Sequence, residues 1–156
     1  MKILILCTGN SCRSQMAHGF LKSYNKALKV FSAGTHPAKK VNSLAVKVMA
    51  EKQTDISEHT PHNVSEYIDE SWDYVITVCG EANETCPVFG GDVKKRLHIG
   101  FDDPSKAQGT NEFIENEFRR VRDLLSHAFY EFYRQELKDQ LDTSCTCGAN
   151  DFCRCN

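Results

Sequence analysis

Short apolar runs alternate with longer amphipathic stretches along the chain. Each run is continuous and rich in β-forming residues, and the runs cover 2–6, 30–33, 73–79 and 95–101. Strands that are buried on both faces of a sheet have this unbroken apolar pattern. The runs therefore predict four strands of one parallel sheet.

The stretches between the runs predict helices at 11–28, 42–52 and 64–72. Ser11 or Ser14 suits the start of the first helix, and Asn42 is the expected N-cap of the second. A longer helix is expected over 110–141, where one face carries Ile114, Phe118, Val121, Leu125, Ala128 and Phe132. Strands that alternate with helices predict an α/β fold, with helices flanking both faces of the four-stranded parallel sheet.

The bulk properties fit one globular domain. A chain of 156 residues can bury a core, and we expect residues 1–142 to form the domain and 143–156 to form a tail without periodicity. The net charge of −2 argues against nucleic-acid binding. No apolar run has the length of a signal peptide or a membrane span. The sequence thus predicts a cytoplasmic protein that does not bind membranes, and we expect a monomer.

Cysteine is abundant for a chain without a visible secretion signal. The eight cysteines are Cys7, Cys12, Cys79, Cys86, Cys145, Cys147, Cys153 and Cys155. Disulfide frameworks belong to oxidising compartments, so these cysteines are expected to be catalytic, redox-active or metal-binding.

The segment "CTGNSCRS" follows the first apolar run and precedes a predicted helix. Gly9 lets the chain curl, and successive backbone N–H groups can then turn inward as an anion-binding nest, next to the helix N-terminus and the Arg13 guanidinium. The predicted oxyanion-binding residues are Thr8, Gly9, Asn10, Ser11, Cys12, Arg13 and Ser14. The same positive field should lower the pKa of Cys7 below that of a free thiol and make it a nucleophile. The alternative is a buried structural cysteine followed by an exposed arginine.

Two motifs carry a family resemblance. "CTGNSCRSQMA" resembles the signature of the low-molecular-weight protein tyrosine phosphatase superfamily, and within it most resembles the thioredoxin-coupled arsenate reductases. "GFDDPSKA", residues 100–107, resembles the late Asp-Pro segment of the family. The resemblance implies the phosphatase-like fold and makes Asp103 the general acid, with Asp102 as the neighbour that could be confused with it. Cys12, inside the loop, is expected to be a packed bystander rather than a nucleophile.

The choice between reductase and phosphatase depends on "VCGEANETCP". A phosphatase needs one nucleophilic cysteine, whereas reduction of arsenate by thiols needs further thiols that act in sequence. The resemblance implies that Cys79 and Cys86 relay electrons after Cys7, and that thioredoxin or a glutathione-linked reductant regenerates them. A low-molecular-weight phosphatase acting on phosphotyrosine or small phosphate esters is the alternative. Ser105 and Lys106 follow the Asp-Pro proline where those phosphatases commonly have aromatic residues, which favours a small inorganic oxyanion.

The chain departs from the family where some thioredoxin-coupled members bind potassium through carboxylates. His18 and His62 occupy the corresponding places, so no potassium site is predicted. Whether the two imidazoles stabilise the loop or are ordinary surface histidines is left open by the sequence.

The tail is a second departure. Cys145, Cys147, Cys153 and Cys155 form two C-x-C pairs whose thiolates suit zinc or As(III). They could equally form disulfides that pass electrons to the Cys79–Cys86 pair. A thiol-rich As(III)- or zinc-binding protein is therefore a third candidate function, while the reductase chemistry itself requires no cofactor.

Overall fold

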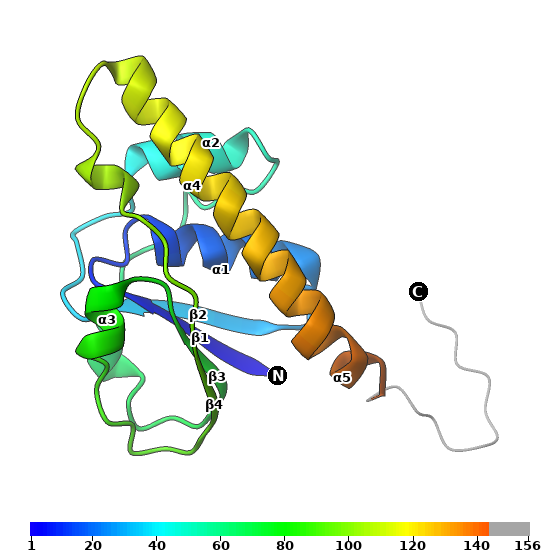
Figure 1. The fold of residues 1–156 in the computed structure, drawn as a ribbon. Coiled ribbons are helices and arrows are strands. Elements are labelled where there is room, and N and C mark those ends of the chain that lie inside the picture. Colours follow the sequence, from blue (N-terminus) through cyan, green and yellow to red (C-terminus); the bar gives the residue numbers. More distant parts are fainter. Residues whose placement is uncertain (144–156) are drawn as a thin grey trace.

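The four strands form one parallel sheet (Figure 1). In the computed structural model, which describes residues 1–143, the order across the sheet is β2-β1-β3-β4. The strands are β1 (Lys2–Cys7), β2 (Lys29–Gly34), β3 (Trp72–Thr77) and β4 (Val93–His98). All three strand pairings are parallel. At the ends of the strands, Cys7 of β1 pairs with Gly34 of β2, and Thr77 of β3 pairs with His98 of β4. The carboxyl ends of the strands therefore meet at one edge, where open α/β sheets bind ligands.

The long helices cover one face of the sheet (Figure 1). They are α1 (Arg13–Tyr24), α2 (Ser43–Ala50) and α4 (Asn111–Phe132). A π-helical turn (Tyr133–Leu137) and α5 (Lys138–Thr143) continue α4. The apolar stripe of α4 packs on the sheet and on α1, and its fully buried members are Phe118, Val121, Leu125, Phe129 and Phe132. The helix predicted at 110–141 is thus confirmed, as are the α/β class and the four-stranded parallel sheet. The Asn42 cap is confirmed too, and its side chain accepts from the Leu44 amide at 2.9 Å.

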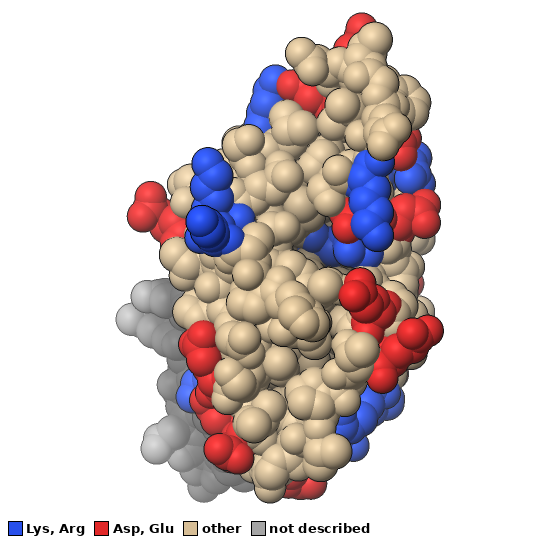
Figure 2. Space-filling view, turned by 90° about the vertical axis from the view of Figure 1, so that its left-hand side faces the viewer, with Lys and Arg blue, Asp and Glu red and all other residues tan. Residues whose placement is uncertain are grey.

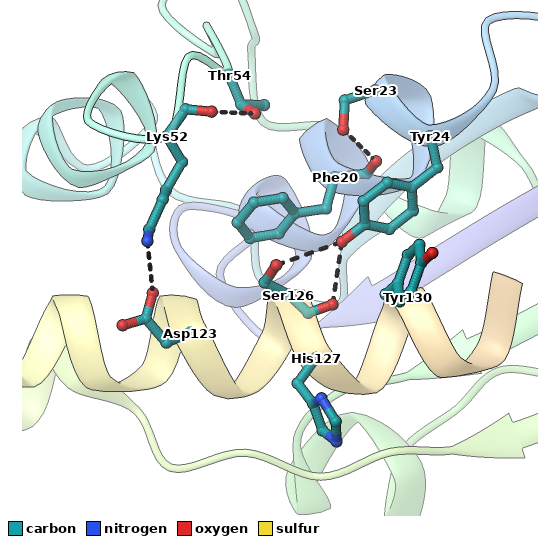
Figure 3. A pocket seen from close by; sticks show the side chains of 9 residues that line it. All are labelled: Phe20, Ser23, Tyr24, Lys52, Thr54, Asp123, Ser126, His127 and Tyr130. Atoms are coloured by element: carbon teal, nitrogen blue, oxygen red, sulfur yellow. Dashed lines mark hydrogen bonds and ion pairs between the residues drawn. The ribbon is translucent and has the colours of Figure 1, made fainter. Parts of the chain in front are cut away.

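Helices α1 and α4 meet beside a cavity of about 590 Å³ (Figure 3). The Tyr24 hydroxyl donates to the Ser126 carbonyl at 3.0 Å, and the ring of Tyr130 packs edge-on against Tyr24. Lys52 reaches Asp123 from the turn after α2, at 3.9 Å. Among the described residues that line this cavity there is no cysteine, so none of the predicted catalytic thiols lies here.

The second face of the sheet has a shorter cover. A single 3-10 turn, η1 (Val64–Glu66), and the segment around Phe89 pack over Leu4 and Val75. The helix predicted at 64–72 is therefore wrong beyond its first turn. The Trp72 amide donates to the Asp92 carbonyl at 2.7 Å, which places Trp72 at the start of β3 instead. None of the helices within residues 1–143 combines the length and the apolar character that a membrane crossing requires.

Candidate active site

A cavity of about 440 Å³ lies at the carboxyl edge of the sheet. Its lining comes from the loop after β1, from the start of α3 (Gly80–Glu84) and from the Asp-Pro segment. The residues are Cys7, Thr8, Gly9, Ser11, Cys12, Arg13, Cys79, Gly80, Glu81, Asp103, Ser105 and Lys106. Figure 2 looks onto this end of the molecule, where charged side chains of both signs are scattered over a mostly uncharged surface. The fold thus gathers residues from three distant parts of the sequence, as the motifs predicted.

Cys7 is nearly inaccessible to solvent and accepts hydrogen bonds from its own loop. The Ser14 hydroxyl lies 2.8 Å from Sγ, and the Asn10 amide donates to Sγ at 3.1 Å. Burial raises the pKa of the Cys7 thiol, while the hydrogen bonds from Ser14 and Asn10 act in the opposite direction. The prediction of a pKa below that of a free thiol is wrong for this geometry. The physical reason is that burial of the sulfur outweighs the hydrogen bonds from Ser14 and Asn10.

Arg13 is bound to the Asp-Pro segment. Its Nη2 lies 3.0 Å from Asp103 Oδ2, and its Nη1 donates to the Phe101 carbonyl at 3.0 Å. The other oxygen of Asp103 accepts from the amide of Ser105 at 3.0 Å and from its hydroxyl at 2.6 Å. Asp102 instead points into solvent, with its side chain 80% exposed, and pairs with Arg120. The structure therefore separates the two aspartates and brings only Asp103 to the cavity wall.

Buried polar side chains support the loop from behind. Asn10 is fully buried with a left-handed φ of 48°, and its Nδ2 donates to Ser14 Oγ at 2.8 Å. Gln15 Nε2 donates to Asn10 Oδ1 at 3.1 Å, and His59 Nδ1 lies 2.9 Å from Gln15 Oε1. Because the Gln15 carbonyl can only accept, His59 donates from Nδ1. Gln15 and His59 were missed by the sequence analysis, since a glutamine in a helix and a histidine in a turn carry no motif of their own.

Gly34 explains how the loop fits against β2. A Cβ at this position would lie 2.4 Å from the Thr8 carbonyl oxygen and 3.1 Å from the Asn10 amide nitrogen. Only glycine allows the oxyanion loop to approach the neighbouring strand so closely. The sequence showed a strand ended by a glycine, without indicating that the loop rests on it.

Two of the predicted relay cysteines share the cavity, and the third does not. Cys79 precedes α3, is buried, and lies 3.5 Å from Thr8 Oγ1. Cys86 follows α3 and is half-buried in a separate cavity of about 250 Å³ with Val75, Thr77, Asn83, Arg96, Leu97 and His98. It packs against the apolar cluster on the second face of the sheet. Cys7, Cys12, Cys79 and Cys86 are all free thiols.

Cys12 is packed in the core beneath the loop. It is 4% exposed, and burial raises the pKa of its thiol to about 12. A thiol with this pKa is protonated at neutral pH and a poor nucleophile. Cys12 is also the N-cap residue of α1 and makes no side-chain capping bond, while Ser14, one of the two serines expected at the helix start, lies inside the helix and contacts Cys7.

The histidines at the potassium positions of some relatives have protein partners. His18 Nδ1 lies 3.1 Å from the Ser32 hydroxyl, and His62 Nδ1 lies 3.0 Å from Glu66. Within residues 1–143, no three His, Cys, Asp or Glu side chains gather as metal ligands. The predicted metal ligands of the tail, Cys145, Cys147, Cys153 and Cys155, lie outside the described residues.

Comparison with known proteins places this geometry in a family. Residues 2–143 match the low molecular weight phosphotyrosine protein phosphatase family, and the chain belongs to it. Among its curated relatives, the arsenate reductase of Halalkalibacterium halodurans is 49% identical over 122 residues, which cover 78% of this chain and 86% of the relative. The arsenate reductase of Bacillus subtilis is 47% identical over 131 residues, covering 83% and 93%.

Solved structures agree on the fold. An arsenate reductase in its oxidized state superposes with a TM-score of 0.74 at 25% identity, covering 86% of this chain and 97% of the other. The YwlE arginine phosphatase from Geobacillus stearothermophilus gives 0.72 at 23% identity, covering 90% and 96%. Both reductases and phosphatases thus use this scaffold, and the fold alone does not distinguish them.

Proposed function

We propose that the protein reduces arsenate to arsenite through Cys7, Cys79 and Cys86. The observation that carries this proposal is the second thiol in the cavity, since Cys79 lines it together with Cys7, Arg13 and Asp103. Hydrolysis of a phosphate ester has no use for a second thiol, whereas a two-electron reduction requires one. The relatives named arsenate reductase support the same choice.

The first step is attack of the Cys7 thiolate on arsenic. The incoming oxyanion takes the Arg13 guanidinium from Asp103, because both anions compete for the same bidentate donor. Asp103, which is ionised in the ion pair, takes up a proton from solvent once Arg13 has moved to the oxyanion. It then gives this proton to the arsenate hydroxyl that leaves as water, while the Cys7–arsenic bond forms. Ser14 and the Asn10 amide favour the ionised sulfur by donating hydrogen bonds to it.

The second step transfers two electrons to arsenic. The Cys79 thiolate attacks Cys7 Sγ, the sulfur–arsenic bond breaks, and its electron pair leaves with arsenite. A Cys7–Cys79 disulfide remains. The Thr8 hydroxyl lies 3.5 Å from the Cys79 sulfur and donates its proton to Glu81 Oε2 at 3.2 Å.

The third step moves the disulfide away from the cavity. The Cys86 thiolate attacks Cys79, which releases Cys7 as a thiolate and leaves a Cys79–Cys86 disulfide. Helix α3 must rearrange for this, because Cys86 lies in a different cavity. The helix has five residues and only Ala82 is buried, so local unwinding breaks few contacts.

We infer that thioredoxin reduces the Cys79–Cys86 disulfide, and that the protein acts as a cytoplasmic monomer. Thiol–disulfide exchange needs an accessible disulfide, and Cys86 begins a surface segment in which Val88 is 90% exposed. A glutathione-linked reductant is the alternative donor.

We also propose the tail cysteines, Cys145, Cys147, Cys153 and Cys155, as a zinc or As(III) site, since two C-x-C pairs offer four soft ligands.

The test follows NADPH oxidation with arsenate, thioredoxin and thioredoxin reductase. Wild type is expected to consume NADPH, and both Cys79→Ser and Cys86→Ser are expected to lose steady-state turnover. Hydrolysis of an aryl phosphate is the control, since it needs Cys7 and water only and should survive in both variants. Unchanged arsenate reduction in both variants would reject the relay. Efficient hydrolysis by a wild type that does not respond to arsenate would establish the phosphatase instead.

A further inference from the structure

Arg96 makes two contacts with the segment that carries Cys86. It lies on the edge strand β4, and its Nη1 is 3.7 Å from Cys86 Sγ. The same guanidinium lies over the ring of Phe89, 5.1 Å from the ring centroid. One side chain therefore contacts both the thiol and the aromatic residue that anchors the segment in the cluster on the second face.

The surroundings of Cys86 are otherwise uncharged or weakly charged. Val75, Asn83 and Leu97 line its cavity without a titratable group. The other titratable side chain is His98, whose Nδ1 is already bound to the Thr77 hydroxyl at 2.8 Å. Burial raises the pKa of the Cys86 thiol, and the charge and hydrogen bond of Arg96 lower it.

We propose that Arg96 is a positioning residue for Cys86, which holds the resolving thiol beside a fixed positive charge and so keeps a larger share of it as thiolate. The inference rests on the proposed function, because only the relay gives Cys86 a role. Arg96 touches no substrate and transfers no proton. It acts through the sulfur that attacks Cys79.

The step that depends on Arg96 is balanced without another reactant. Cys86 loses its proton to solvent, its thiolate forms a bond with Cys79 Sγ, and the Cys7–Cys79 bond breaks with Cys7 leaving as a thiolate. No electrons are gained or lost overall. Because thiolate is the attacking species, the rate follows the ionised fraction of Cys86.

The experiment titrates Cys86 in the full-length chain. Iodoacetamide labelling of the Cys86 peptide is followed by mass spectrometry across the pH range in wild type, Arg96→Met and Arg96→Lys. Lys94→Met is the matched control, because Lys94 is an exposed cation on the same face of β4 that pairs with Asp73. The midpoint of labelling reports ionisation independently of how exposed the sulfur becomes.

Arg96→Met is expected to raise the labelling midpoint by about half a pH unit, which lowers the thiolate fraction at neutral pH about threefold. Arg96→Lys keeps the charge and should stay near wild type, and Lys94→Met should not move. Rapid-quench measurements of the conversion of the Cys7–Cys79 disulfide to Cys79–Cys86 should show a slowing of about twofold in Arg96→Met. The loss of thiolate is partly offset, because the thiolate of a less acidic thiol is more nucleophilic.

The inference would be overturned if the labelling midpoint of Arg96→Met did not shift, or if that of Lys94→Met shifted equally. Faster disulfide conversion in Arg96→Met would overturn it as well. These readouts are distinct from a failure of the proposed function. A wild type that does not reduce arsenate would reject the relay, whereas an active enzyme with an unshifted Cys86 would reject the role of Arg96 alone.

Discussion

The guanidinium of Arg13 and the carboxylate of Asp103 form an ion pair, 3.0 Å from Nη2 to Oδ2, in the wall of the cavity that contains Cys7. The side chains are 11% and 22% exposed, so the pair is shielded from solvent. The proposed general acid thus restrains the proposed oxyanion ligand. Binding of the substrate oxyanion to Arg13 and release of Asp103 from Arg13 are therefore linked events.

Replacing Asp103 should separate binding from chemistry. Asp103→Asn removes the proton donor and frees Arg13, so kcat for arsenate is expected to fall about 10²-fold or more. Inhibition by phosphate should become stronger, because the oxyanion no longer competes with a carboxylate. Steady-state kinetics with phosphate as inhibitor measures both. Asp102→Asn is the control, since Asp102 is exposed and pairs only with Arg120 among the described residues. Weaker phosphate binding by Asp103→Asn would contradict the competition.

Arg13→Lys tests whether activity requires the two-pronged hydrogen bonding of the guanidinium or only its positive charge. Lysine keeps the charge but cannot bind two oxygens in one plane, so kcat/KM should fall about 10²-fold. The same enzyme assay measures this, with circular dichroism to show that the fold is intact. Activity close to wild type would mean that charge alone suffices.

A methyl group at Gly34 should displace the oxyanion loop. The Cβ of Gly34→Ala would lie 2.4 Å from a backbone oxygen, so the backbone itself must move. Destabilisation of about 1–3 kcal/mol is expected in urea unfolding, because overpacking has costs of this size. A misplaced loop should also lower kcat/KM about 10²-fold. Gly80→Ala is the control for stability, since a Cβ there meets no atom within 4 Å.

His18 should make the folded chain sensitive to mild acid. Burial, together with the neighbouring His59, lowers the pKa of His18 to about 3 from an ordinary value of 6.5. As the pH falls, His18 is therefore protonated in the unfolded chain at a higher pH than in the folded chain. The free energy of unfolding is unaffected by His18 above about pH 6.5 and declines as the pH falls toward 3. Stability should fall by up to about 1.4 kcal/mol per pH unit from this group.

Urea unfolding at several pH values measures the effect. His18→Asn cannot titrate and should flatten the decline between pH 6.5 and 5. His127→Asn, an exposed histidine on α4, should leave it unchanged. Parallel declines in wild type and His18→Asn would show that another group is responsible.

The sequence predicted the parts of the site that are local in the chain. Strand, glycine-containing loop and helix follow one another around Cys7, so periodicity and motif spacing were sufficient. The support behind the loop was not predictable, because Gln15 and His59 are 44 residues apart and meet only after α1 packs on the sheet. The pKa of Cys7 was predicted in the wrong direction for a similar reason. It depends on how deeply the sulfur is buried, and the packing of the folded chain decides that rather than the motif.

The separate cavity of Cys86 has a consequence for the idle enzyme. A stray oxidant that reaches the open cavity meets Cys7 and Cys79, while Cys86 lies in its own cavity with Asn83 and Arg96. The outer disulfide can therefore close only after Cys7 and Cys79 have been oxidised and α3 has rearranged, so the reduced enzyme at rest makes no demand on its electron donor.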